Sequence, residues 1–337
     1  MELENTIKEM LPHIESELHY SIDEYISSDT PELKTMLDYH MGWEGEGNGI
    51  HAQGKRIRPL LVLLSAGAIN SKWENALPAA AAVELLHNFS LIHDDIQDNS
   101  SFRRGRPTVW KKWGVAQAIN AGDLLFTIAN LAIFRINQGL SSDKIISASL
   151  LLHNSSVNLT HGQYLDISYE SRNNIEVDSY WKMIEGKTAS LLGCCTEMGA
   201  LIAGCEPDRQ LAFKQFGFTL GLAFQIIDDW LGIWGDSAQT GKSTHSDLVS
   251  GKKTLPILFA LSQKGKFSRI WENGKINPED VTEISKILEN EGAREYTEIT
   301  AKKLTIESLQ FLEEAAIFQD YKNALIDLSN VLLSRNK

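Results

Sequence analysis

The chain of 337 residues contains only three cysteines and eight prolines. An odd number of cysteines, two of them adjacent at Cys194 and Cys195, suggests neither a disulfide framework nor a zinc site, and we interpret all three as small core residues. The first residues lack the basic flank and the apolar stretch of a signal peptide, and no segment approaches about 18 consecutive apolar residues. The sequence therefore predicts a cytoplasmic protein without a transmembrane segment.

Positive charge is also scarce. The chain has 32 lysine and arginine residues against 44 aspartate and glutamate residues, which gives a formal net charge of −12. Such a field repels nucleic acid and anionic membrane surfaces, so neither is an expected partner. An anionic ligand must then be met by local basic clusters or by a metal ion.

Alternating strand patterns are hard to find, whereas apolar residues recur at helical spacing almost everywhere. This pattern predicts an all-α fold, and we expect one domain over residues 1–337. Glycine-rich segments such as residues 42–54 and 235–251 are typical of loops between helices. Residues 79–92 and 186–204 are apolar around most of a helical circumference, which indicates central helices in a large bundle.

The strongest chemical signal lies in the segment that begins at His93 and reads HDDIQD. On a helix, Asp94 and Asp98 lie one turn apart on the same face, and Asp95 sits beside them. A few carboxylate oxygens suit Mg²⁺, which binds through one or two carboxylates together with substrate phosphates and water. Taken alone, this motif is more often a solvated acidic helix end than a metal site.

The motif has companions elsewhere in the chain. A second carboxylate pair, Asp228-Asp229, also follows an apolar run, and two such helices facing each other across a cavity would hold metal ions from opposite walls. Arg103 and Arg104 follow Asp98 and are well placed to grip phosphate oxygens. Other short basic clusters, most of which adjoin glycine and so let backbone approach a ligand, contain Lys55, Arg56, Arg58, Lys187, Lys242, Lys252 and Lys253. In an acidic chain, such clusters favour a buried anionic ligand.

These residues match the pattern of a known family. The segments QGKRIRP, HNFSLIHDDIQDNSSFRRGRPTVW, GKTASLL, FQIIDDWLG and GKKTLP, in this order, resemble the trans-isoprenyl diphosphate synthases, or polyprenyl synthetases, over about residues 54–259. The resemblance implies an all-α bundle around a deep central cavity. It also implies a homodimer, Mg²⁺ as cofactor, and isopentenyl diphosphate and an allylic diphosphate as substrates.

The resemblance also implies a role for each matching residue. The metal ligands would be Asp94, Asp98 and Asp228, supported by Asp95 and Asp229. The allylic diphosphate would be held by Arg103, Lys187, Gln225 and Lys242, and isopentenyl diphosphate by Lys55, Arg58, His87 and Arg104. Thr188 would face the carbocation that forms when the allylic diphosphate leaves.

One position departs from the family pattern. The second motif usually reads DDxxD, but here Gly232 stands where the last aspartate is expected. Asp236 is a possible replacement, provided that the helix continues past Gly232 and Gly235. We expect weaker or water-mediated binding of one metal ion, with activity retained.

Product length is predicted from the residues one turn before the first motif. Phe89 is bulky and Ser90 is small, and in the family this combination resembles geranylgeranyl (C20) diphosphate synthases. Farnesyl or longer products remain alternatives. Two other functions also stay open: a class I terpene cyclase, which needs no isopentenyl diphosphate site, and a non-catalytic partner subunit of a heteromeric synthase, for which the altered second motif would be evidence.

Overall fold

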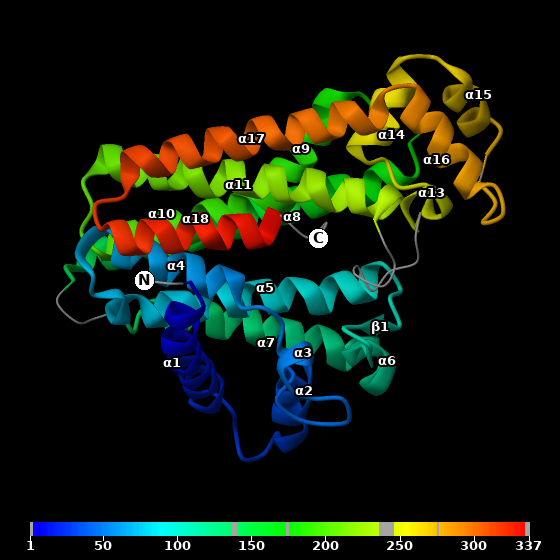
Figure 1. Cartoon of the computed structure of the whole chain (residues 1–337). Coiled ribbons are helices and arrows are strands. Elements are labelled where there is room, and N and C mark those ends of the chain that lie inside the picture. The colour runs from blue at the N-terminus through cyan, green and yellow to red at the C-terminus, as the bar shows by residue number, and fades with distance from the viewer. Residues whose placement is uncertain (1–2, 137–139, 173–174, 236–245, 275, 334–337) are drawn as a thin grey trace. The chain divides into compact units, whose positions relative to one another are not determined.

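The computed structural model describes the chain except residues 1–2, 137–139, 173–174, 236–245, 275 and 334–337. Helices dominate it (Figure 1), which confirms the all-α prediction. Contacts divide the chain into two compact units. The first contains Met1–His153, Cys195–Gln210 and Ala316–Ala324, and the second contains Asn154–Cys194, Leu211–Ala315 and Leu325–Lys337. A single domain over the whole chain stays a prediction.

The first unit holds the N-terminal half of the chain. Its elements are α1 (Leu3–Asp23), α2 (Pro31–Met41), α3 (Ile50–Gln53), α4 (Ile57–Asn70), the short 3₁₀ helix η1 (Trp73–Ala76), α5 (Leu77–Gln97), β1 (Phe102–Arg103), β2 (Arg106–Pro107), α6 (Val109–Trp113) and α7 (Val115–Ile133). Within the described residues, β1 and β2 make the only strand pairing, an antiparallel hairpin with Arg103 opposite Arg106.

The core of this unit explains where the first aspartate motif sits. Helix α5 runs along α7 (Figure 1) and also contacts α4 and α1. Residues 79–86 of α5 are all buried, which is the burial that the apolar sequence predicts. The helix ends at Gln97 and Asp98 is its C-cap, so the motif occupies the last turn. There the helix dipole is negative, which disfavours carboxylates unless cations compensate.

The second unit holds most of the remaining helices. Its own elements are α9 (Val177–Ile184), the π-helical turn η2 (Glu185–Ala189), α13 (Ser246–Ser250), α14 (Leu255–Ser262), α15 (Lys266–Glu272), α16 (Val281–Asn290) and α17 (Ala293–Ala315). Four helices have residues in both units: α8 (Ser142–Glu170), α10 (Ser190–Ile202), α11 (Pro207–Trp234) and α18 (Gln319–Leu333). Helix α17 lies along α11, and the Ser308 hydroxyl donates to the Phe216 carbonyl at 3.1 Å.

The π-helical turn η2 carries Lys187 and Thr188, and glycines allow it to touch α8. A Cβ added at Gly162 would lie 2.0 Å from the backbone nitrogen of Lys187, and one at Gly186 would lie 2.6 Å from the carbonyl oxygen of Asn158. Turns of π-helix occur frequently at functional sites. The two glycines therefore set the position of the lysine and threonine that the sequence assigns to the site.

Two helices, α7 and α11, pass a test of length and composition for membrane spans, each with a mean hydropathy of 1.2. Core helices pass the same test, and 61% of the tested stretch of α11 and 44% of that of α7 are buried inside the protein. Helix α11 also carries Asp228 and Asp229 close to its end. These helices are weak evidence for a span, and the absence of a transmembrane segment stays a prediction.

We predict that Gly162→Ala destabilises the protein, because its new methyl group would meet the backbone of Lys187, which cannot rotate away. The expected loss in free energy of unfolding is about 1–3 kcal/mol, measured by urea denaturation. The control is Thr160→Ala at an exposed position on the same helix. Equal stability of the two variants would contradict the close approach of α8 and η2.

Candidate functional site

The predicted site residues fall into two groups, one in each unit. In the first group, the three aspartates of the first motif differ in environment: Asp94 is half-buried, Asp98 is exposed and Asp95 is buried. The backbone N–H of Asp98 donates to the Asp94 carbonyl at 2.8 Å, so the two residues occupy successive turns of one helix face. The two more accessible carboxylates are thus the ones that the sequence assigns to the metal.

Asp95 instead supports an arginine. The Nε of Arg103 lies 2.9 Å from both carboxylate oxygens of Asp95, and its Nη2 lies 2.9 Å from Oδ1. Burial raises the pKa of Asp95, and the arginine opposes that shift. Because the fork fixes the guanidinium plane, Asp95 positions the Arg103 side chain. The Arg103 side chain keeps 31% exposure, so part of it remains accessible to a ligand.

The hairpin turn places Arg104 beside the end of the glycine-rich segment 42–54. Arg104 and Gly105 both have positive φ, 51° and 75°, as a tight two-residue hairpin turn requires. The Nη1 of Arg104 donates to the Ala52 carbonyl at 2.7 Å. A Cβ at Gly54 would lie only 2.6 Å from its Nη2, so the guanidinium packs directly against this glycine, whose φ is +83°. The structure thus brings the RRG and GKR segments together, as the predicted isopentenyl diphosphate site needs.

The basic residues of GKRIRP have different surroundings. Lys55 is exposed and Arg58 is half-buried, whereas Arg56 is buried. Arg56 binds Glu15 at 2.6 Å and Glu84 at 3.0 Å. It therefore anchors the loop, while its two neighbours remain candidates for ligand binding.

His87 lies on the same face of α5 as Asp94, because the two are two helical turns apart. Burial, followed by the charges of Arg58, Arg104 and Arg103, lowers the pKa of His87 well below its usual value. The same kind of environment lowers the pKa of His40. Both imidazoles are therefore neutral at pH 7, and His87 can donate one hydrogen bond without adding charge.

The two predicted chain-length residues face different neighbours. Ser90 is buried and shares the helix face of Asp94, four residues away. The ring of Phe89 lies 5.1 Å from that of Phe126 on α7 and 4.8 Å from that of His93. Phe89 thus contributes to the boundary between α5 and α7, and Phe126 is a second aromatic there that sequence reasoning missed.

The second group centres on η2 and α11. Lys187 forms an ion pair with Asp166 of α8, and the Thr188 hydroxyl donates to Gln225 Oε1 at 2.7 Å. The other end of the amide, Gln225 Nε2, donates to Asp229 Oδ1 at 3.0 Å. Because the only hydroxyl proton of Thr188 points to Gln225, its lone pairs are left for an electron-poor ligand.

Asp229 is buried and holds this network in place. Its Oδ2 accepts hydrogen bonds from the Tyr180 hydroxyl at 2.6 Å and from the Leu255 backbone N–H at 3.1 Å. Burial raises the pKa of Asp229 to about 6, and the charge of Lys252 opposes that shift. Its contacts give Asp229 a positioning role, whereas the half-buried Asp228 is the carboxylate of the pair that is more accessible to a metal.

Several assignments from the sequence change or stay open. Helix α11 continues through Gly232 to Trp234. Both Lys242 and Asp236 lie outside the described residues. Lys253 proves to be structural, because its Nζ lies 2.6 Å from the Tyr169 carbonyl and 3.1 Å from that of Glu170, where it caps the end of α8.

Sequence reasoning missed the partners that hold the site residues. Asp166 pairs with Lys187, Tyr180 donates to Asp229, and Asp247 lies against Gly232. These partners come from α8, α9 and α13, at sequence distances that no local motif reveals. Only the spacing between Gln163 and Asp166, on one face of α8, hints at a polar role.

A divalent cation fits the carboxylates of each group. In the part of the chain that the structure describes, no three His, Cys, Asp or Glu side chains converge as a complete metal site. Asp94 with Asp98, and Asp228 alone, offer the one or two carboxylates that Mg²⁺ uses when substrate phosphates and water complete its shell. The donor set excludes a closed structural zinc site, which needs four nitrogen or sulfur ligands.

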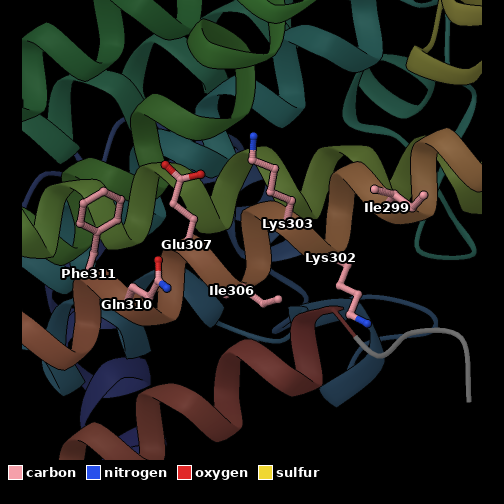
Figure 2. Close-up of a pocket in the computed structure, with 7 residues that line it drawn as sticks. All are labelled: Ile299, Lys302, Lys303, Ile306, Glu307, Gln310 and Phe311. Carbon is pink, nitrogen blue, oxygen red and sulfur yellow. The ribbon is translucent and has the colours of Figure 1, made fainter.

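A hollow of about 830 Å³ lies elsewhere, on α17. Figure 2 shows that its seven lining side chains all project from this one helix; they are Ile299, Lys302, Lys303, Ile306, Glu307, Gln310 and Phe311. None of them is a predicted site residue. A hollow lined by one helix is a surface groove, and it offers no convergent polar groups of the kind found in an active site.

Comparisons with known proteins agree with the motifs. The family model described as polyprenyl synthetase matches residues 47–290. A (2E,6E)-farnesyl diphosphate synthase from Mycobacterium tuberculosis is 35% identical over 315 residues, which is 90% of this chain and 87% of that protein. A geranylgeranyl diphosphate synthase from the same organism is 43% identical over 244 residues, which is 72% of this chain and 69% of that protein.

A solved structure with a similar fold contains ligands. It is a geranylgeranyl pyrophosphate synthase from Corynebacterium glutamicum, described as complexed with isoprenyl diphosphate and magnesium. It matches with a TM-score of 0.81 and 28% identity, covering 96% of this chain and 97% of that one. The similarity therefore extends over nearly the full length of both chains.

The depressed pKa of His87 predicts a loss of stability in acid. Below about pH 6.5 the unfolded chain binds a proton at this residue that the folded chain does not. The free energy of unfolding therefore decreases as the pH is lowered, by up to about 1.4 kcal/mol per pH unit. In His87→Gln, urea denaturation at pH 7.5, 6.5 and 5.5 should show a shallower fall. The control is His51→Gln at an exposed position, and equal pH dependence of the two variants would contradict the shift.

Proposed function

Because the chain belongs to the polyprenyl synthetase family, we propose that it is a trans-prenyltransferase that joins isopentenyl diphosphate to an allylic diphosphate. The observation that carries the proposal is common to both groups of site residues. Each group contains an accessible carboxylate and a cation that a second carboxylate holds in place. In the first group Asp95 holds Arg103, and in the second group Asp166 holds Lys187. Fixed cations beside metal-binding carboxylates suit a diphosphate leaving group.

The metal in this proposal is Mg²⁺, held by Asp94, Asp98 and Asp228. When bound, it neutralises charge on the departing diphosphate and so favours ionisation of the allylic C–O bond. The C. glutamicum synthase, described as a complex with magnesium, supports this choice. So does the all-oxygen donor set, which suits a hard cation.

The protein side chains bind and orient the two substrates. Arg103, Lys187, Gln225 and Lys242 hold the allylic diphosphate, and Lys55, Arg58, His87 and Arg104 hold isopentenyl diphosphate. Thr188 turns its oxygen lone pairs toward the carbocation, which is attacked by the double bond of isopentenyl diphosphate. A proton is then lost, and the departing diphosphate is its acceptor. Water must be excluded, because it would trap the cation as an alcohol.

The proposed product is geranylgeranyl diphosphate, and farnesyl diphosphate is the second candidate. Phe89 with Ser90 supports the C20 product, and the position of Phe89 against Phe126 is compatible with a floor at the α5–α7 boundary. The farnesyl alternative is supported by the M. tuberculosis relative that bears that name. The charged, water-soluble substrates support a cytoplasmic location.

Product analysis tests the proposal directly. The purified protein is incubated with Mg²⁺, labelled isopentenyl diphosphate and, separately, dimethylallyl, geranyl or farnesyl diphosphate, and the products are sized by chromatography. Label in products that end at C20 is the expected result. A cyclic hydrocarbon formed without isopentenyl diphosphate would identify a terpene cyclase, and no turnover with any substrate would identify a non-catalytic subunit.

The enzyme is also proposed to be a homodimer, and α8 supplies support. Five apolar side chains of this helix are 38–66% exposed and recur at intervals of three, four or seven residues: Ile146, Leu150, Val157, Tyr164 and Ile167. This spacing places them on one face of the helix. Exposed apolar side chains that recur along one face of a long helix are typical of a surface that another chain covers.

The double variant Leu150→Glu/Val157→Glu should convert the dimer to monomers, because two charges would be buried in the contact. Light scattering coupled to size-exclusion chromatography measures the mass. Ile299→Glu/Ile306→Glu on α17 is the matched control, with the same seven-residue spacing and similar exposure, 60% and 50% against 56% and 52%. A dimeric mass for both double variants would exclude this face of α8.

We predict that Phe89→Ala lengthens the product beyond that of the natural enzyme. Removing the ring opens space between α5 and α7 where a growing prenyl chain would otherwise stop. Product sizing with farnesyl diphosphate as starter measures the effect. Phe318→Ala, at an exposed position, should leave the product unchanged, and an unchanged product in both variants would remove Phe89 from the floor.

A further inference from the structure

The end of α11 contains an arrangement that the sequence motif does not reveal. Gly232 follows Asp228 by four residues, so the two lie on the same helix face one turn apart. A Cβ added at Gly232 would lie 2.1 Å from Oδ2, 2.5 Å from Cγ and 3.0 Å from Oδ1 of Asp247. The carboxylate of Asp247 therefore occupies the space in which a side chain at position 232 would begin.

The chain holds Asp247 in this place. Its carbonyl accepts hydrogen bonds from the backbone N–H of Lys252 at 3.1 Å and from the Ser250 hydroxyl at 3.2 Å, which close the end of α13. The next residue, Leu248, is 1% exposed and belongs to the same apolar cluster as Ile233 of α11. Burial of Leu248 thus anchors α13 beside Gly232, and Asp247 itself stays half-buried.

The charges around Gly232 are mostly negative. Asp228 and Asp229 lie within two turns of the end of α11, and Asp247 brings a further carboxylate to the face of Gly232. A divalent cation would offset part of this charge.

We propose that Asp247 supplies the carboxylate that position 232 lacks and acts as a further ligand, directly or through water, of the divalent cation at Asp228. This inference rests on the proposed function. It replaces Asp236, which the sequence suggested, with a residue from another helix. Because Mg²⁺ keeps several waters, a carboxylate that reaches it through water still contributes to binding. Mg²⁺ binding therefore loses less affinity through the absence of a carboxylate at position 232 of α11.

The competing explanation is structural: the Asp247 carboxylate merely fills the space over Gly232. The two explanations differ in what happens when the carboxylate is moved from one helix to the other. Gly232→Asp alone should lower thermal stability, because it forces the Asp247 side chain to shift and places a second carboxylate beside it. Combining it with Asp247→Ala removes this crowding and returns one carboxylate to this place from the α11 side.

Isothermal titration with Mg²⁺, in the presence of saturating inorganic diphosphate, measures the effect without turnover. Asp247→Asn keeps the shape of the side chain and should weaken Mg²⁺ binding about tenfold or more. The double variant Gly232→Asp/Asp247→Ala should recover most of that loss. Asp178→Asn, at an exposed position on α9, is the control and should bind as the natural protein does.

The outcomes separate the inference from the proposed function. Natural Mg²⁺ affinity in Asp247→Asn, or a double variant as weak as Asp247→Asn, would overturn the inference. Asp228→Asn is the reference: if it also binds Mg²⁺ with natural affinity, the metal assignment itself fails. Thermal unfolding without metal checks each variant, and the double variant still decides the question if Asp247→Asn does not fold.

Discussion

The crowding of carboxylates near the C-terminal ends of α5 and α11 is the constraint on which the rest of the site depends. The first motif lies in the last turn of α5, where the helix dipole is already negative, and Asp228 and Asp229 lie within two turns of the end of α11. A fold that places carboxylates there must supply cations. Arginine and lysine supply some of that charge, and divalent metal bound with a diphosphate would supply the remainder.

In each group of site residues, the two adjacent aspartates have different surroundings. One aspartate of each pair is buried and hydrogen-bonded to protein, and the other is more accessible. Asp95 fixes Arg103, and Asp229 fixes Gln225 and, through it, Thr188. The buried member therefore fixes a neighbouring polar side chain, which gives the two adjacent acids different structural roles.

Asp247 brings a carboxylate to this place from a different helix. A motif read along one helix is incomplete at Gly232, but the space above that glycine holds a carboxylate from α13. The absence of a side chain at position 232 leaves room for this approach, since a Cβ there would force the Asp247 carboxylate to shift. A carboxylate at this place therefore does not require an aspartate at position 232.

The sequence by itself determined the helical class, the positions of both aspartate pairs and the family, because these depend on local spacing and on runs of residues that are rare by chance. Tertiary structure decided the roles of Asp95 against Asp94, of Arg56 against Arg58 and of Lys253, because burial and partners distinguish chemically identical side chains. It alone revealed Asp166, Tyr180 and Asp247. These residues reach the site from separate helices, and no periodicity along the chain encodes which distant helices come into contact.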